Sequence, residues 1–569
     1  MKKNTLSTKN FLYAFQNVKL PWVMLLLAVI GTIVNYVFTL KLATLTADVV
    51  NATGDVATTK LMSYVMAGLA MLLGVAGSFF CSGIASEKIN LSLRTKLWRK
   101  LIHLPRNHYD KDKGEGLVSR ITTDCTYSST LFTVIVNLAA AIVGIVIYYV
   151  ELFQSNAAIS AVSVLILPVS VLIAWGYGKL RYVVSNRTQD QLSQTTSYLI
   201  ERVYNLPLIR AANMQEDERS VGVEKFKTLY SVEIKRGLLD ALNTFINSAL
   251  PLVTMAIVFL MGGKYVNEGT MTAGGVYAFY YVANQSAVLF ANIIDYFGSV
   301  RSAYGAMDRV VDALHQEGEN VADGKVAPKE AEVAFNHVAF AYDDKPILRD
   351  VDLQIPKNKL TVIVGANGAG KSTIFRLLER FYGVDDGSIT MNGISAGDYS
   401  LASWRRTIGF MPQDGVLMAG TIRSNLSMGA GRYLEDNEID PVIRQLGIEE
   451  FISELPDGYD TVVEVGGSNF SGGQKQLLGM ARVLLYDPKI LLLDEATSNL
   501  DGHSSHQVQQ ALSKLRENRT IVMIAHDLQT ILGADYAIVL QDGKVEYAGD
   551  PKQVLGSVQS HWKNIMREA

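Results

Sequence analysis

Cysteine and charged residues are both scarce in this chain of 569 residues, whose only cysteines are Cys81 and Cys125. Neither a disulfide framework nor a zinc site with Cys/His ligand spacing is expected. Charged residues make up 19% of the chain, against roughly 25% in soluble domains. The net charge of −3 lacks the basic excess of a nucleic-acid-binding surface, so no nucleic-acid partner is expected.

The scarcity of charge is confined to the first half of the chain, where long apolar runs occur. A helix needs about 20 mostly apolar residues to cross a bilayer core of about 30 Å. Six stretches meet this length: Pro21–Leu42, Met62–Ile84, Leu131–Leu152, Ala157–Tyr177, Phe245–Gly262 and Ala273–Ile294. They predict an all-α domain of six transmembrane helices over residues 1–305, embedded in the lipid bilayer.

Basic residues predict the orientation of these spans. Lysines precede the first span, and more Lys and Arg lie in two long polar segments, Ser86–Ser129 and Gly178–Thr244. The positive-inside rule therefore places the N-terminus and the C-terminal half in the cytosol. No cleavage site follows the first span, which indicates a retained helix. We expect a multi-pass protein of the cell membrane, specifically a bacterial plasma membrane.

The second half has the composition of a soluble protein. Residues 306–330 read as a linker, since Gln316–Lys329 is polar and contains Gly and Pro. From 331 to 569, apolar strand-like runs alternate with helical patterns, which predicts an α/β domain with a largely parallel, buried sheet.

A glycine-rich loop carries the strongest chemical signal. It matches G-x-x-x-x-G-K-[ST] between a predicted strand and a predicted helix, through Gly365, Asn367, Gly368, Gly370, Lys371, Ser372 and Thr373. Its backbone N–H groups and the helix N-terminus would hold ATP phosphates. Lys371 would reach the β- and γ-phosphates, and Ser372 would bind Mg²⁺.

A second signal is the apolar run Lys489–Leu493, which ends in Asp494 and Glu495. A strand that ends in two carboxylates after a phosphate loop is typical of ATP-hydrolysing domains of the P-loop NTPase class. Asp494 would hold Mg²⁺ directly or through water. Glu495 would orient and deprotonate the attacking water.

A third motif, Phe470-Ser471-Gly472-Gly473-Gln474, closely resembles the LSGGQ signature of ABC transporter ATPases, with Phe470 in the Leu position. The remaining motifs of that family follow in order. The resemblance implies that Tyr342 stacks on adenine, Gln413 is the Q-loop glutamine and a further Mg²⁺ contact, Asp501 belongs to the D-loop, and His526 contacts the γ-phosphate. Leu477 and Asp527 depart from the family pattern, where arginines are usual.

The resemblance covers essentially the whole chain and implies a half-transporter of the exporter (type IV) architecture. In that family Ser471, Gly473 and Gln474 complete the ATP site of a second subunit, so a dimer is implied. The intact motifs favour a homodimer, and a heterodimer with a degraded partner stays open. Coupling helices are expected near Gly114–Thr123 and Val203–Ala212.

The transported substrate is the least constrained prediction. Tyr277, Tyr281, Asn284 and Gln285 in the sixth span would suit an exported amphipathic small molecule, peptide or lipid. The alternative for the tyrosines is an interfacial belt or helix packing. An importer with an exporter-like fold, or an ATP-gated regulatory or channel role, also remains open at this stage. Six spans exclude a soluble ABC ATPase of translation or repair.

Overall fold

The computed structural model describes residues 13, 15–16, 18–51, 56–111, 115–328, 332–413, 415–494, 512, 515–516, 518–525 and 527–553. The chain divides into two compact units. The first contains Met1–Ile102 and Gly114–Gln316, and the second contains Glu317–Ala569 together with the short segment His103–Lys113. The second unit therefore includes a piece of chain that lies far upstream of the rest of it.

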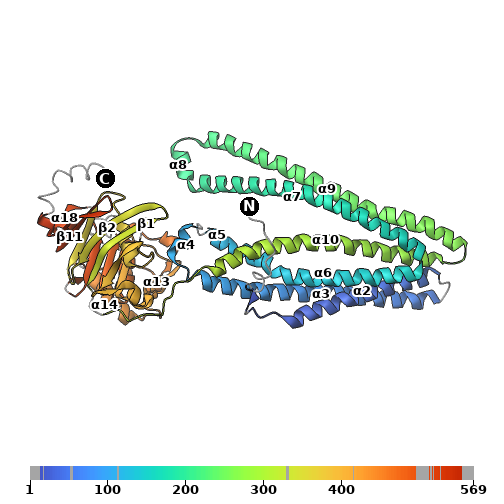
Figure 1. Cartoon of the computed structure of the whole chain (residues 1–569), viewed down its shortest axis with the longest axis horizontal. Helices are drawn as coiled ribbons and strands as arrows, with labels where there is room; N and C mark the ends of the chain where they lie inside the picture. Colours follow the sequence, from blue (N-terminus) through green and yellow to red (C-terminus); the bar gives the residue numbers. More distant parts are fainter. Residues whose placement is uncertain are drawn as a thin grey trace. The chain divides into compact units, whose positions relative to one another are not determined.

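Long helices build the first unit (Figure 1). They are α2 (Trp22–Asn51), α3 (Val56–Leu101), α6 (Cys125–Ser155), α7 (Ala157–Tyr204), α9 (Gln215–Asn267) and α10 (Ala273–His315). Each predicted span falls on one of these helices, except that Pro21 precedes α2. The short helices α5 (Glu115–Ser119), η1 (Arg120–Asp124, a π-helix) and α8 (Leu206–Ala211) connect them.

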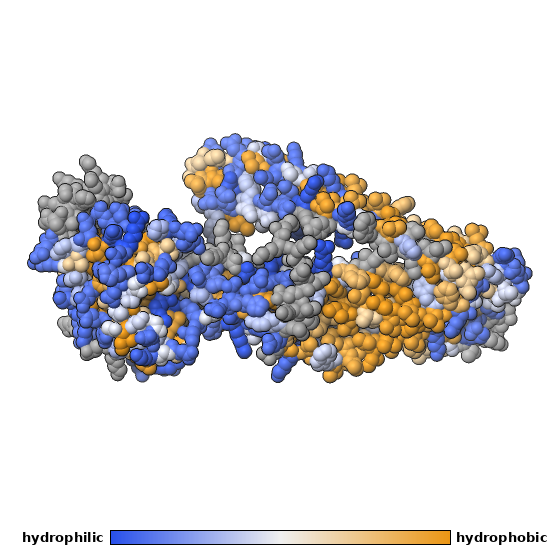
Figure 2. Space-filling view, in the orientation of Figure 1, coloured by the Kyte–Doolittle hydropathy of each residue, from blue (hydrophilic) through white to orange (hydrophobic). Residues whose placement is uncertain are grey.

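Four of these helices are long and apolar enough to cross a membrane, judged on the described residues. They are Trp22–Asn51, Lys60–Leu101, Gly116–Ser155 and Gln215–Asn267. The described parts of α7 and α10 do not qualify on the same measure, and α10 mixes Asn284, Gln285 and Asp295 into its apolar stretch. An apolar surface covers α2 and α3 in Figure 2, where Leu26, Leu73, Phe79 and Phe80 are exposed. A surface of this kind suits contact with lipid.

Small residues allow α2 and α3 to cross closely. A Cβ added to Gly31 would lie 2.8 Å from the Gly74 carbonyl oxygen, and one added to Gly74 would lie 2.9 Å from that of Gly31. The hydroxyls of Thr32 and Ser78 hydrogen-bond beside this crossing at 2.7 Å. Small residues and hydroxyl pairs of this kind stabilise helix contacts where apolar burial alone does not favour them.

The first coupling helix was expected near Gly114–Thr123, and this stretch belongs to the first unit from Gly114 onward, so its contact with the second unit stays a prediction. The segment that joins the second unit is His103–Lys113, which contains α4 (Arg106–Lys111). We call His103–Lys113 the contact segment. The second expected position, Val203–Ala212, contains α8, whose residues Leu206 and Leu208 are exposed.

Two sheets form the framework of the second unit. The first has the order β12-β11-β3-β10-β9-β6, with β3 (Leu360–Gly365), β6 (Ile408–Met411), β9 (Ile490–Asp494), β10 (Thr520–Ile524), β11 (Tyr536–Gln541) and β12 (Lys544–Gly549). All pairings are parallel except that of β12 with β11. The second sheet is antiparallel, in the order β2-β1-β4-β5, with β1 (Val333–Tyr342), β2 (Lys345–Ile355), β4 (Asp386–Met391) and β5 (Ile394–Ser395).

Helices cover the parallel sheet, whose central strands are apolar and buried on both faces. They are α11 (Lys371–Leu378), α12 (Leu401–Thr407), α13 (Ile422–Ser427), α14 (Asp436–Leu446), α15 (Glu449–Ser453), α16 (Gly472–Leu484) and α18 (Leu528–Leu532), with a small sheet of β7 (Gly420–Thr421) and β8 (Val462–Val463). Trp404 of α12 is fully buried, and its Nε1 donates to the Leu378 carbonyl at 2.6 Å. The helical first half and the α/β second half agree with the sequence prediction.

Candidate nucleotide-binding site

The strands that precede the predicted nucleotide-binding motifs all end at the same edge of the parallel sheet. Strands β3, β10, β9 and β6 are neighbours in that order and run in the same direction. Asp494 at the end of β9 lies level with Ile524 of β10, and Ile524 lies level with Ile363 of β3. Met411, the last residue of β6, pairs with Leu493. The carboxyl edge of an open α/β sheet is where such domains bind ligands.

The glycine-rich loop begins where β3 ends. Gly368 and Gly370 have φ of +85° and +103°, which only glycine adopts readily. A Cβ on Gly370 would also lie 2.6 Å from Leu348 Cδ2. Both glycines therefore let the backbone turn tightly into α11, whose N-terminus offers N–H groups and positive dipole to a phosphate.

Lys371 is the first residue of α11 and is 7% exposed. Its Nζ donates to the carbonyl oxygens of Gly365 and Ala366, at 2.8 and 3.0 Å. The ammonium thus sits inside the loop it would use for phosphate. Asn367, Ser372 and Gly368 are exposed, whereas Thr373 is buried among the residues that hold α11 on the sheet.

Tyr342 ends β1 and belongs to an aromatic cluster. Its ring makes edge contacts with Phe340 and Tyr382, at centroid distances of 4.8 and 5.1 Å. Its hydroxyl accepts a hydrogen bond from Arg376 of α11 at 3.0 Å, and the guanidinium also lies over the ring. A tyrosine fixed in this way beside the phosphate-loop helix can offer a flat surface to a base.

The expected magnesium ligands are all oxygen donors: the Ser372 hydroxyl, the Gln413 amide and the Asp494 carboxylate. Magnesium prefers hard oxygen ligands and usually keeps several waters. Ser372 is exposed at the start of α11, and Asp494 is half-buried where β9 ends. The donor chemistry therefore fits Mg²⁺ bound together with a nucleotide.

The signature motif lies at the N-terminus of α16. Ser471 is the N-cap: its Oγ accepts from the Gln474 N–H at 3.2 Å, and Gln474 Oε1 accepts from the Ser471 N–H at 2.9 Å. This capping box keeps the helix end ordered while Ser471 stays exposed. Phe470 is buried and contacts Phe451 edge-on, so an aromatic ring takes the Leu position without disturbing the helix start.

Three predicted site positions, the catalytic Glu495 and His526 and the ATP-binding Asp501, lie outside the described residues. Their roles therefore stay predictions. Asp527, one of the departures from the family pattern, is described and caps α18, where its Oδ1 accepts from the Thr530 N–H at 2.7 Å. The residue thus has a local structural role that an arginine in its place would not fill.

Sequence reasoning missed Gln476, which is 2% exposed on α16. Its Nε2 donates to the backbone carbonyl of Gln413 at 3.0 Å. Among the described residues its Oε1 has no hydrogen-bond partner. Through this hydrogen bond, Gln476 connects the backbone at Gln413 to α16, the helix that begins with the signature motif. The two glutamines lie 63 positions apart in sequence, so no local pattern predicted their contact.

Replacing Gln476 by Leu should lower ATP turnover about 5- to 30-fold, because a backbone hydrogen bond worth about 1–2 kcal/mol no longer positions the Q-loop. Leucine also removes the buried unpaired Oε1, so the thermal midpoint should change little. Phosphate release by the purified protein measures turnover, and the exposed Gln445→Leu on α14 serves as control. Wild-type turnover in Gln476→Leu would contradict the positioning role.

The residues predicted to contact substrate lie on α10. Tyr277 is 41% exposed and its ring contacts that of Tyr280, whereas Tyr281 is partly buried against an apolar cluster shared with α2, α6 and α9. Asn284 Oδ1 is buried and has no hydrogen-bond partner among the described residues. Gln285 is partly buried. No described contact separates a substrate role from helix packing for these side chains.

The fold and this site define a membrane-embedded nucleotide-binding protein, and comparison with known proteins names its family. Residues 22–288 match the transmembrane region of ABC transporters, and residues 348–498 match the ABC transporter ATPase domain. The chain therefore belongs to the ABC transporter family, with the organisation of an exporter-type half-transporter. It is a multi-pass membrane protein that binds ATP and uses its hydrolysis to drive transmembrane transport.

Named relatives agree with this assignment. A multidrug resistance ABC transporter ATP-binding and permease protein of Lactococcus lactis subsp. lactis is 30% identical over 99% of this chain and 96% of its own length. Its counterpart from Lactococcus lactis subsp. cremoris is 29% identical over the same shares. An ABC-type oligopeptide transporter of Rattus norvegicus is 28% identical over 88% of this chain and 66% of its own length.

Proposed function

We propose that this protein is one half of a dimeric exporter that moves an amphipathic small molecule, peptide or lipid outward across the membrane. The observation that carries the proposal is the convergence of the phosphate loop, Gln413 and Asp494 at one sheet edge, in a chain that also contains long apolar helices. The relatives named for multidrug resistance and oligopeptide transport support the substrate class.

The proposed membrane arrangement keeps six spans in residues 1–305, a linker over 306–330 and the ATPase domain over 331–569. Four qualifying helices support the count in part, and α7 and α10 are long enough for the remaining two. The basic residues of the two polar segments support a cytosolic N-terminus and ATPase domain in a bacterial plasma membrane.

In the proposed ATP site, Tyr342 contacts adenine and the loop N–H groups hold the phosphates. Lys371 Nζ leaves the Gly365 and Ala366 carbonyls and binds the β- and γ-phosphate oxygens. Ser372, Gln413 and Asp494 would hold Mg²⁺, whose chemistry when bound is to neutralise the phosphate oxygens. Glu495 takes the proton from the attacking water, and His526 contacts the γ-phosphate.

The dimer is proposed because the signature residues face outward from their own domain. Ser471 is exposed at a capped helix N-terminus, a position suited to an anion supplied from outside. A second copy whose Lys371 holds ATP would present such an anion, and Gly473 and Gln474 would flank it. ATP then binds the closed pair more tightly than the open one, and this difference in affinity drives the conformational change.

A transport assay in sealed vesicles tests the proposal. Purified protein is reconstituted into vesicles, and ATP is added outside, where it reaches only the molecules whose ATPase domains face outward. Uptake of a fluorescent amphipathic cation into the vesicles is then followed. Export predicts ATP-dependent accumulation inside these vesicles. ATP-dependent loss of the cation from preloaded vesicles, instead of accumulation, would indicate an importer. Downhill flux that needs ATP binding but not hydrolysis would indicate a gated channel, and either result would overturn the export assignment.

A further inference from the structure

The chain passes between its two units at three places. It crosses after Ile102, where the contact segment begins, returns after Lys113, and crosses again after Gln316. Whatever movement ATP causes in the second unit must reach the helices of the first through these connections or through surfaces beside them. The residues that hold the connections to the ATPase unit are therefore candidates for transmitting that movement.

Glu319, four residues after α10 ends at His315, contacts both the contact segment and the ATPase core. Its backbone N–H donates to the His103 carbonyl at 2.7 Å. Its carboxylate receives two hydrogen bonds from Arg405, Nη1 to Oε2 at 2.7 Å and Nη2 to Oε1 at 2.8 Å. The two side chains are 16% and 28% exposed. A bidentate, largely buried pair holds its geometry better than an exposed ion pair.

Arg405 extends this link to the phosphate-loop helix. Its Nε donates to the Glu379 carbonyl at 3.1 Å and its Nη2 to the Arg380 carbonyl at 3.3 Å, both directly after α11 ends. Its guanidinium lies 5.3 Å from the Phe381 ring centroid. Burial raises the pKa of Glu379 to about 8. Glu319 is the carboxylate that forms the ion pair with Arg405.

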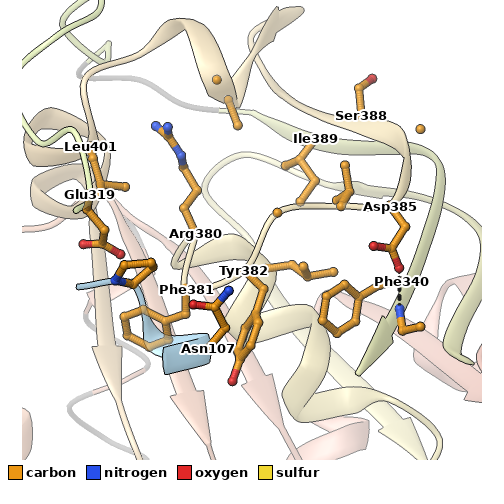
Figure 3. Close-up of a pocket in the computed structure, with 18 of the residues that line it drawn as sticks. Asn107, Glu319, Phe340, Arg380, Phe381, Tyr382, Asp385, Ser388, Ile389 and Leu401 are labelled. Carbon is orange, nitrogen blue, oxygen red and sulfur yellow. Dashed lines mark hydrogen bonds between the residues drawn. The ribbon is translucent and has the colours of Figure 1, made fainter. Parts of the chain in front are cut away.

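The opposite ends of the same elements reach the ATP site. Helix α11 begins at Lys371, and α12, which carries Arg405, continues directly into β6 and then to Gln413. Figure 3 shows Glu319, Arg380 and Phe381 around a cavity of about 890 Å³ that Asn107 of the contact segment also lines. Glu319, through its backbone N–H and its ion pair with Arg405, therefore joins the linker, the contact segment, the phosphate-loop helix and the strand before the Q-loop.

We propose that the Glu319–Arg405 pair is the anchor that couples ATP-driven movement to the membrane helices. The inference rests on the proposed transport function and extends it to residues outside the ATP site. Glu319 is a positioning residue, because its carboxylate accepts hydrogen bonds from Arg405 and acts on the ATP site through that residue. With the anchor broken, the ATPase core still closes on ATP, but the contact segment and linker no longer follow it.

The test compares Glu319→Ala with the exposed control Glu317→Ala in full-length protein reconstituted in vesicles. ATP turnover of Glu319→Ala should stay within about threefold of wild type, whereas the amount of fluorescent cation transported per ATP should fall at least about tenfold. Glu317→Ala should resemble wild type in both.

The double variant Glu319→Arg/Arg405→Glu should recover part of the transport per ATP that the single variant Glu319→Arg loses. A purely structural role would lower turnover and transport together and leave their ratio unchanged, which would overturn the proposal.

A second measurement does not depend on the transported substrate. A spin label on Glu268→Cys, placed after α9 in a Cys81→Ala/Cys125→Ala background, reports the distance between the two copies. ATP should shift this distance when the anchor is intact and should leave it unchanged in Glu319→Ala. An equal shift in both proteins refutes the anchor. If the wild type shows the shift but transports nothing, the proposed export function fails while the anchor remains supported.

Discussion

Replacing Glu495 by Gln should lower ATP turnover by roughly 10²–10⁴-fold while ATP binding persists. Glutamine keeps the size of the side chain but cannot accept the proton of the attacking water. Asp494, the residue directly before it, ends β9 at the sheet edge where the phosphate loop begins. Phosphate release measures turnover, and a fluorescent ATP analogue measures binding.

The exposed Glu454→Gln at the end of α15 makes the same chemical change away from the site and should be silent. A purified Glu495→Gln protein that hydrolyses ATP at the wild-type rate would refute the assignment of Glu495 as the base. Loss of ATP binding in the same protein would instead indicate that Glu495 has a structural role in the site.

Replacing Lys371 by Ala should weaken ATP binding by about 10- to 150-fold, because a buried ammonium loses charge-assisted hydrogen bonds worth about 1.5–3 kcal/mol. Turnover should fall with it, since the γ-phosphate loses its cation. The Gly365 and Ala366 carbonyls also lose their donor, so the loop should become less ordered without nucleotide. Lys544→Ala on β12 is an exposed control that should bind ATP normally.

Mixing two inactive subunits tests whether Lys371 and Ser471 serve the same ATP from different chains. In a dimer of Lys371→Ala with Ser471→Arg, one composite site keeps both native residues and the other has lost both. Turnover should therefore reappear in the mixed dimer, although neither variant is active alone. If the mixed dimer stays as inactive as its parents, the two residues do not share a site in this way.

Local patterns were enough to predict the parts of the site that depend on neighbouring residues. The phosphate loop, the strand before Asp494 and the helix after Ser471 each occupy one continuous stretch, and the structure forms all three. Gln476 and Glu319 could not be found in this way, because their partners Gln413 and Arg405 lie 63 and 86 positions away. Contacts over such distances depend on how the whole domain packs.

The contact segment was not predicted to belong to the ATPase unit, for a related reason. The run around Gly114 correctly indicates an interruption between helices, but it does not show which side contacts the ATPase unit. Helix α4 has only six residues, too few for an apolar period to identify its buried face. Leu104 and Pro105, just before this helix, are the residues that could have located it, and the structure buries Leu104 and half-buries Pro105.

The ATPase unit is built from two separate stretches of chain, and this constrains the order in which the protein can fold during synthesis. The contact segment leaves the ribosome roughly 200 residues before Glu317, which takes about 10–40 s at about 5–20 residues per second. During that interval it has neither the Glu319 N–H nor the surface around Phe381 to contact. The ATPase unit can therefore be completed only after Gly114–Gln316, which belong to the first unit, have been synthesised.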